Sequence, residues 1–431
     1  MLRNSDLFTR QKAVLPNWAP VYYENPIELV RGEGCRVWDR EDNEYIDFFG
    51  GILTTMAGYN IPEIVDAIKD QAGKMIHSST LYLIEAQIEL AEKIAELSGI
   101  EDAKVFFVNS GSEANDAALM IATAYRRSNQ ILAMRHSYHG RSFATVPVTG
   151  QKSWSPSSLS PFAVHYIHGS YRYRSPFKDM SDADYTKACV EDLDNMLAVA
   201  TSGDVACLIA EPILGVGGFS APPDGFFGSI KERLDQDGIL FISDEVQTGW
   251  GRTGEHFWGY QAHSITPDII TFAKGIGNGL PMGGVIASAK IMDCFNAVSI
   301  STFGGNPLVS RGALATLNYV VDHNLQENAH RQGALMRDRL NKLREKYEFI
   351  GEVRGKGLAL AIEIVKSKTD ITPDPAKTVS ILEASKASKL LVGKGGFYGN
   401  VIRFAPPMSI SKDEMNEGLD RLESAFANIN G

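Results

Sequence analysis

The sequence predicts an α/β protein, with a mostly parallel central sheet flanked by helices and a smaller α+β lobe built from both termini. Its 431 residues exceed one ordinary domain and suffice for a large core plus a smaller lobe. Short apolar runs alternate with helical patterns, which is typical of a parallel sheet covered on both faces. The runs are Val105–Val108, Gln130–Met134, Val205–Ala210, Ile239–Ser243, Ile269–Phe272 and Gly284–Ser288.

The first 60 residues are expected to form part of the smaller lobe. The stretch GCRVWDREDNEYIDF at 34–48 has turn residues between β-forming residues, which predicts a hairpin. Pro62 then opens a helix through PEIVDAIKDQAGKM. A second helix follows, with one apolar face and further apolar residues alongside it. Its face is expected to hold Ile84, Ile88, Ala91 and Ala95, with Leu90, Ile94 and Leu97 beside them.

The C-terminal part begins with a long helical pattern after about residue 310, through LVSRGALATLNYVVDHN and on to KLREKY. GEVRGKGLALAIEIV and NVIRFAPPM then predict strands of a separate α+β lobe, which we expect to pack against the N-terminal residues. The expected division is an N-terminal part of the small domain at 1–60, a large domain at 61–315 and a C-terminal small domain at 316–431.

Composition narrows the classes of partner. The chain is 44% hydrophobic and 22% charged, as in globular proteins, and its net charge of −10 disfavours nucleic acid and anionic membranes. The N-terminal MLRNSDLFTRQK has no apolar stretch typical of a secretory signal, and no window approaches about 20 uninterrupted apolar residues, so we expect a cytoplasmic protein. The four cysteines are dispersed, which favours free thiols and no metal site.

Lys274 and Asp244 are the most informative pair in the chain. Lys274 ends an apolar run in PDIITFAKGIGNGLP, and Asp244 ends an earlier one in ILFISDEVQTGWGRTG. A lysine condenses with an aldehyde cofactor, and a carboxylate keeps a pyridine nitrogen protonated so that the ring accepts electrons. The pair therefore indicates pyridoxal phosphate chemistry and amino-group transfer.

These segments also have other interpretations. A lysine at a strand end is usually a surface residue, but the glycine-rich sequence after Lys274 favours a tight, enclosed loop. The run ending in Asp244 and Glu245 also resembles the acidic strand of a P-loop ATPase, but the chain lacks G-x-x-x-x-G-K-[ST]. KGIGNG matches the dinucleotide fingerprint poorly, so a nicotinamide enzyme is disfavoured.

Three more segments carry candidate binding residues. VFFVNSGSEANDAALMIATAYRR predicts a strand, a tight turn and a helix whose start favours a phosphate near Ser110, Gly111 and Ser112, although an ordinary capped turn has the same pattern. Arg141 and Arg403 are candidates for binding carboxylates, but a lone arginine more often forms a structural salt bridge. Tyr138 is a candidate for stacking on a cofactor, although an aromatic beside a strand end is more often part of the core.

Taken together, the segments resemble the class-III aminotransferases, the ω-aminotransferase group of fold-type I pyridoxal phosphate enzymes. The resemblance covers nearly the whole chain. Within the family, the chain most resembles the 4-aminobutyrate and alanine–glyoxylate aminotransferase 2 branches. Its most specific part is an ordered set of motifs: SGSEAND, SYHGRS, AEPILG, SDEVQTGWGRTG, TFAKGIGNGLPMGG and STFGGNP.

The resemblance implies pyridoxal 5′-phosphate as the cofactor and assigns roles around it. Lys274 would form the Schiff base and move the proton between the substrate α-carbon and the cofactor, while Asp244 would pair with the pyridinium nitrogen. Gln247 would reach the phenolic oxygen of the cofactor. Thr302 would complete the phosphate site of the neighbouring subunit, giving a homodimer or a dimer of dimers with shared active sites. The further cofactor-binding residues would be Ser110, Gly111, Ser112, Tyr138, His139, Glu211 and Val246.

Departures from the family pattern bear on the substrate, for which Ile52, Arg141 and Arg403 are the implied binding residues. Many relatives that use glutamate carry an acidic residue where this chain has Val216, so Arg403 should stay available for an α-carboxylate. Ile52 stands where dialkylglycine decarboxylase has a glutamine, which disfavours decarboxylation. GYNIP at 58–62 replaces a common G-H-x-H-P pattern.

The sequence therefore predicts an aminotransferase that acts on small amino acids and 2-oxo acids. The donor would be an ω-amino acid resembling 4-aminobutyrate or a small amino acid, and the acceptor pyruvate, glyoxylate or 2-oxoglutarate. The amino group would be stored on the cofactor between two half-reactions. The alternatives are a decarboxylating transaminase of the 2,2-dialkylglycine decarboxylase type and a non-catalytic relative that still binds pyridoxal phosphate.

Overall fold

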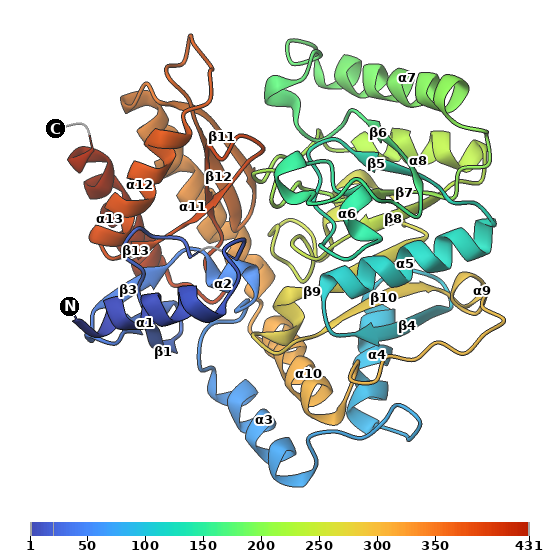
Figure 1. Ribbon diagram of the computed structural model, residues 1–431, viewed down its shortest axis with the longest axis horizontal. Coiled ribbons are helices and arrows are strands. Elements are labelled where there is room, and N and C mark those ends of the chain that lie inside the picture. The colour runs from blue at the N-terminus through green and yellow to red at the C-terminus, as the bar shows by residue number, and fades with distance from the viewer. Residues whose placement is uncertain (1, 20, 430–431) are drawn as a thin grey trace.

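A computed structural model describes residues 2–19 and 21–429, in which a seven-stranded sheet forms the centre of the larger part (Figure 1). The strand order is β4-β10-β9-β8-β7-β5-β6, and only β10 runs antiparallel to its neighbours. The strands are β4 (Ala103–Val108), β5 (Gln130–Met134), β6 (Ala163–Ile167), β7 (Cys207–Ala210), β8 (Leu240–Asp244), β9 (Ile269–Ala273) and β10 (Gly283–Ser288). The prediction of a mostly parallel sheet is confirmed.

Each of the six apolar runs is a strand, but the edge strand β6 was not predicted. Its sequence, AVHYI, is only partly buried and carries His165, so it does not read as an apolar run. Strands β5, β7, β8 and β9 are buried along their whole length, which explains why their sequences are almost entirely apolar.

Helices cover both faces of this sheet because successive strand side chains point in opposite directions. α5 (Gly111–Arg126) packs on one face against Ile131, Ile209 and Ile242. The neighbouring residues Leu132, Leu208 and Phe241 face α7 (Asp182–Ala200) and α8 (Phe226–Gln236) on the other. The short helices of the large part are α6 (Thr145–Val148), α9 (Ala289–Met292), η1 (Lys152–Trp154), η2 (Arg172–Arg174), η3 (Gly259–His263) and η4 (Lys274–Gly277).

The predicted helices before and after the sheet are present. Pro62 opens α3 (Pro62–Lys74), which α4 (Glu85–Leu97) follows. The prediction for the buried face of α4 was partly wrong, because Leu90 and Ile94 are buried whereas Ile88 is exposed. α10 (Pro307–Asp322) packs on α3 and α4. The expected domain boundary at residue 315 lies inside this helix. The remaining long helices are α1 (Leu2–Val14), α11 (Leu325–Lys346), α12 (Pro375–Ala387) and α13 (Lys412–Asn428).

Both ends of the chain build the smaller part, where blue and red segments lie side by side in Figure 1. The predicted hairpin consists of β2 (Arg36–Asp39) and β3 (Glu44–Asp47), with β1 (Leu29–Glu33) beside β2. From the C-terminal end, β13 (Leu390–Leu391) pairs in parallel with β3. A separate sheet has the order β11 (Ile350–Lys356), β12 (Ala359–Ile364), β15 (Val401–Phe404) and β14 (Gly393–Gly395).

Membrane insertion through a helix finds no support in the structure. Across residues 2–19 and 21–429, none of the helices combines the length and the apolar composition that crossing a bilayer requires.

Candidate active site

A cavity of about 150 Å³ opens beyond the carboxyl ends of β4, β8 and β9, where α/β sheets commonly bind ligands. The structure brings ten of the sequence-predicted residues together around it. They are Ser110, Gly111, Ser112, Tyr138, His139, Glu211, Asp244, Val246, Gln247 and Lys274. Asn115 and Gly140 also line the cavity, and sequence reasoning did not single them out.

Asp244 presents a buried carboxylate to the cavity, fixed by two neighbours. The Nδ2 of Asn115 donates a 2.7 Å hydrogen bond to Oδ2 of Asp244, and His139 Nδ1 lies 2.8 Å from the same oxygen. Thr271 fixes the amide orientation of Asn115 by donating its hydroxyl to Oδ1 at 2.7 Å. Asn115 lies four residues after Gly111 on α5, so helical spacing alone places both on one face of the helix.

Lys274 begins the short helix η4 in a left-handed conformation, with φ of +50°. Non-glycine residues rarely adopt this conformation, and when they do they often lie at functional sites. The pKa of Lys274 is lowered to about 8, chiefly by burial; Asp244 and Glu211 act in the opposite direction, and nearby Arg403 also lowers it. A substantial fraction of this amine is therefore unprotonated at mildly alkaline pH and available as a nucleophile or base.

Glu211 links two loops around the cavity. Its carboxylate accepts hydrogen bonds from the backbone N–H of Tyr138 and of Gly215, each at 2.8 Å. The pKa of Glu211 is raised to about 7, chiefly by burial; His139 and the two backbone hydrogen bonds act in the opposite direction, and the charge of Asp244 also raises it. A second titratable carboxyl thus lies within electrostatic reach of Lys274.

The start of α5 forms a candidate phosphate site. Ser110 caps this 16-residue helix by accepting a hydrogen bond from the N–H of Glu113 at 3.2 Å. Gly140 faces it with φ of +131°, and a Cβ at this position would lie 2.5 Å from the hydroxyl oxygen of Ser112. Only glycine therefore fits there. Unpaired N–H groups and the helix dipole favour an anion at this point.

Two buried polar atoms of the cavity residues have no hydrogen-bond partner within the described parts of the chain. They are Oε1 of Gln247 and Nε2 of His139. Buried polar atoms are normally paired, so these two indicate a missing polar ligand. An amine, an acceptor carboxylate, an anion site and a free amide side chain suit an aromatic aldehyde that carries a ring nitrogen, a hydroxyl and a phosphate. The residues present therefore fit pyridoxal 5′-phosphate.

The remaining predicted residues do not line this cavity. Arg403 lies in β15 and is only 4% exposed, and its guanidinium donates to the backbone oxygens of Gly215 and Lys394, each at 3.1 Å. Its Nε has no partner among the described residues. The other three predicted residues are exposed on the surface of the chain: Ile52, Arg141 and Thr302.

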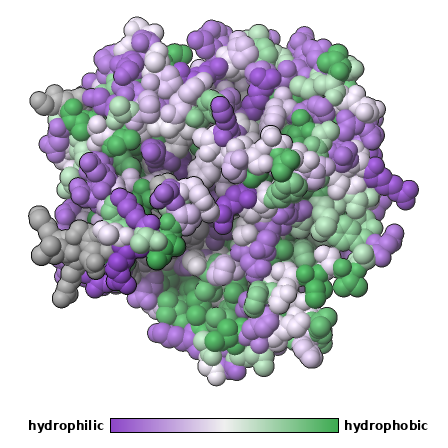
Figure 2. All heavy atoms as spheres, in the orientation of Figure 1, coloured by the Kyte–Doolittle hydropathy of each residue, from purple (hydrophilic) through white to green (hydrophobic). Residues whose placement is uncertain are grey.

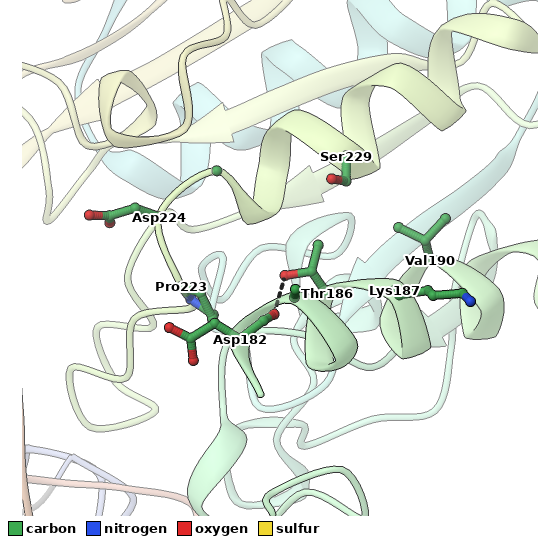
Figure 3. Close-up of a pocket in the computed structure, with 9 residues that line it drawn as sticks. Asp182, Thr186, Lys187, Val190, Pro223, Asp224 and Ser229 are labelled. Atoms are coloured by element: carbon green, nitrogen blue, oxygen red, sulfur yellow. Dashed lines mark hydrogen bonds between the residues drawn. The ribbon is translucent and has the colours of Figure 1, made fainter. Parts of the chain in front are cut away.

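A larger hollow of about 600 Å³ lies elsewhere, between the N-terminal half of α7 and the start of α8 (Figure 3). Figure 3 shows Asp182 and Asp224 with their carboxylates pointing away from the amine of Lys187. The hydroxyl of Thr186 is already bonded to the backbone oxygen of Asp182 at 2.9 Å. None of the residues that the sequence singled out lines this hollow.

Known proteins share the whole architecture of this chain. The model of the family "Aminotransferase class-III" matches residues 19–426. Alanine–glyoxylate aminotransferase 2 homolog 2, mitochondrial, from Arabidopsis thaliana is 38% identical over 94% of this chain and 84% of its own. A leucine/methionine racemase from Thermococcus litoralis is 37% identical over 99% of this chain and 96% of its own. An amine transaminase from an uncultivated Pseudomonas species, solved with pyridoxal phosphate bound, superimposes with a TM-score of 0.90 at 29% identity, over 96% of this chain and 98% of its own.

The sequence, the fold and the cavity therefore agree on one family and one cofactor. The resemblance recognised in the motifs is confirmed, and pyridoxal 5′-phosphate is the cofactor of that family. This chain belongs to the class-III aminotransferase family.

Proposed function

We propose that the enzyme moves an amino group from an ω-amino acid resembling 4-aminobutyrate, or from a small amino acid, to a 2-oxo acid such as pyruvate, glyoxylate or 2-oxoglutarate. The observation that carries this proposal is the environment of Arg403. Its buried guanidinium bonds to backbone oxygens and forms no ion pair with any described residue, and its charge acts on the amine of Lys274. A substrate carboxylate beside the reacting carbon supplies the anion that this guanidinium lacks.

The side chains of the cavity divide the chemistry between them. When bound, pyridoxal 5′-phosphate supplies an aldehyde that carries the amino group and a ring that accepts electrons. Lys274 takes a proton from the substrate α-carbon, a task for which a pKa near 8 suits its amine. Asp244, fixed by Asn115 and His139, holds a proton on the ring nitrogen. The start of α5 would bind the phosphate, and the amide group of Gln247, whose oxygen has no partner among the described residues, would bind a polar group of the cofactor.

The loop after Glu211 supports a preference for substrates with an α-carboxylate. Its backbone joins the cavity to Arg403, because Gly215 donates to Glu211 and accepts from Arg403. Val216 in this loop accepts a hydrogen bond from the N–H of Gly396 at 2.9 Å through its backbone oxygen. An apolar valine side chain cannot form an ion pair with Arg403, so the guanidinium stays available for a substrate.

Arg403→Ala is expected to raise the KM for pyruvate by about thirtyfold or more, since losing one partner of a buried charge pair costs at least about 2 kcal/mol. The KM for 1-phenylethylamine, a donor without a carboxylate, should change little. Steady-state kinetics with each substrate varied in turn measure both constants. Equal increases for both substrates would remove Arg403 from the role of carboxylate receptor.

Racemisation is a second candidate reaction, because one relative is named a leucine/methionine racemase. Both reactions begin with removal of the α-proton, which is the step assigned to Lys274. A screen of 4-aminobutyrate, β-alanine, ornithine, alanine and 2-aminoisobutyrate against the three 2-oxo acids separates the reactions. Transfer requires a 2-oxo acid, whereas inversion of L-alanine does not. Release of CO₂ from 2-aminoisobutyrate would instead support the decarboxylating alternative.

We infer that the active unit is a homodimer or a dimer of dimers, because a large apolar patch is exposed. Figure 2 shows hydrophobic residues gathered in the lower part of the molecule, over α3, α10 and α4. The segment after α3 and the segment before α10 meet here, since the ring centroids of His77 and Phe303 are 5.1 Å apart. Exposed patches of this kind mark interaction sites. The apolar patch comprises Met75, Ile76, Leu81, Tyr82, Leu83, Ile300 and Phe303.

Thr302 lies between two residues of the apolar patch, which favours its expected role at the phosphate site of a second copy. Sedimentation should give at least twice the chain mass. Leu83→Asp places a charge on a side chain that is 93% exposed in the single chain and should shift the enzyme to monomers. Val199→Asp on α7 is the matched control, because Val199 is 83% exposed outside the patch. If both variants sediment like the wild type, this patch is not the interface.

The cytoplasmic location stays a prediction. The name of the relative from Arabidopsis thaliana includes the word mitochondrial, so fractionation of cells that express the full chain is the relevant measurement.

A further inference from the structure

The segment α2 (Gly50–Leu53) is a turn of left-handed backbone. Its four residues have φ values of +54°, +59°, +67° and +64°. Glycine adopts this conformation readily, but Ile52 is β-branched and Leu53 is bulky, so both are strained there. Such strain persists only where the surrounding structure holds the backbone in place. The contacts that hold this turn therefore indicate its structural role.

Asp47 anchors the turn from the end of β3. Its Oδ1 accepts hydrogen bonds from the N–H of Phe49 at 2.7 Å and of Gly50 at 3.1 Å. The residue is 3% exposed, and no described cation forms an ion pair with it. Successive N–H groups in such a conformation form a concave anion site. The carboxylate of Asp47 thus fills a site that the turn itself creates.

Tyr59 completes the arrangement and explains the GYNIP departure in physical terms. Its hydroxyl donates a 2.6 Å hydrogen bond to Oδ2 of Asp47. The tyrosine is fixed in turn, because its backbone pairs with Gly34 and its ring packs against Gly32, where a Cβ would lie 2.6 Å from the ring. Within the described chain, Tyr59 is the one side chain that donates a hydrogen bond to Asp47.

Phe49 connects this anchored turn to the substrate side of the active site. Asp47 holds the backbone of Phe49, and the Phe49 ring lies 5.1 Å from the guanidinium carbon of Arg403. The ring is also stacked on Tyr22 at 5.8 Å and packs tightly against the backbone of Gly393. A cation over an aromatic ring is attracted to its face, so the position of Phe49 constrains that of Arg403.

We propose that Tyr59 and Asp47 are positioning residues that hold Phe49, and through it Arg403, in the orientation that binds a substrate carboxylate. The inference rests on the proposed role of Arg403 as carboxylate receptor. Loss of the Tyr59 hydroxyl leaves one oxygen of a buried carboxylate without its partner, and the strained turn then relaxes. The cost falls on carboxylate recognition, because Phe49 follows Asp47 by two residues and contacts the guanidinium directly.

Tyr59→Phe in the holoenzyme tests the proposal. We expect the KM for pyruvate and the inhibition constant of oxamate, an unreactive isostere of pyruvate, to rise by about tenfold, which is the range for a hydrogen bond to a charged group. The kcat with saturating pyruvate and the KM for 1-phenylethylamine should stay within about twofold of the wild type. This split distinguishes positioning from a loss of stability, which would lower all the activities together.

Tyr45→Phe is the matched control. Tyr45 is also buried in the small sheet and donates its hydroxyl to an aspartate, Asp39, at 2.9 Å, but neither residue contacts Phe49 or Arg403 in the described structure. It should leave the oxamate constant unchanged. Unchanged oxamate binding in Tyr59→Phe, or an equal change in Tyr45→Phe, overturns the proposal.

Arg403→Ala measured beside these variants separates the two levels of the argument. If Arg403→Ala weakens oxamate binding and Tyr59→Phe does not, the positioning role fails while the proposed function stands. If Arg403→Ala leaves oxamate binding unchanged, the proposed carboxylate receptor fails, and the positioning role fails with it.

Discussion

Lys274→Ala should reduce amino-group transfer by about 10⁴-fold or more, because it removes the residue proposed as both the nucleophile and the base of the reaction. Lys274 is the one lysine among the residues that line the cavity, so no neighbouring amine replaces it. The cofactor should still bind non-covalently, since the α5 terminus, Asp244 and Gln247 remain. Steady-state rates and the cofactor retained after gel filtration measure the two effects separately.

The control for Lys274→Ala is Lys290→Ala, which removes an exposed lysine of α9 and should leave the rates unchanged. In the wild type, borohydride reduction and peptide mapping should place the cofactor on residue 274. Turnover within about tenfold of the wild type in Lys274→Ala would exclude this residue as the proton carrier. A wild-type enzyme that binds the cofactor yet transfers no amine from any donor would support the non-catalytic alternative.

Asp244→Asn should lower kcat by about 10³-fold, the range seen when a preorganised charge or donor is removed from an active site. The substitution keeps the size of the side chain but replaces a carboxylate by an amide. Asn115 and His139 both lie within hydrogen-bonding distance of Oδ2, so an amide NH₂ group turned toward them would meet the NH₂ donor of Asn115 and lose that hydrogen bond. Single-turnover rates with alanine isolate the loss in the first half-reaction.

Glu245→Gln is the matched control for Asp244→Asn. Glu245 is the next residue and is also buried. Its carboxylate does not face the cavity but accepts hydrogen bonds from the hydroxyl of Thr248 and the backbone N–H groups of Gly259 and Tyr260. It should lower the free energy of unfolding with a much smaller effect on kcat. Equal kinetic losses in the two variants would mean that Asp244 contributes through folding rather than through its charge on the ring.

The sequence predicted most of the sheet and cavity because their signals are local. Lys274 and Asp244 directly follow or end buried apolar strands, and parallel strands bring such ends to one edge of the sheet. Ser110 and Gly111 mark a strand-to-helix turn by residue type alone. Asn115 lies in the SGSEAND motif, but the role of an asparagine inside a helix can be recognised only once the strand that carries Asp244 is known to face it.

The contacts of the small lobe were less predictable because they depend on tertiary structure. Isoleucine disfavours the left-handed backbone that Ile52 adopts, so the residue type at this position does not predict the turn. The bond between Tyr59 and Asp47 exists because that turn reverses the chain between them. Likewise, the partly buried edge strand β6 lacks the apolar run that identified its neighbours, and pairing with β5 decides its structure.

The pairing of β3 with β13 has a consequence for biosynthesis. The backbone N–H of Ile46 in β3 donates a 3.1 Å hydrogen bond to the oxygen of Lys389, which precedes β13, so the ribosome has made almost the whole chain before β3 meets this partner. The residues that line the cavity lie between 110 and 274 and emerge well before that point. The cavity residues therefore leave the ribosome before Arg403, the residue proposed to receive the substrate carboxylate, because domains generally fold from the N-terminal side during synthesis.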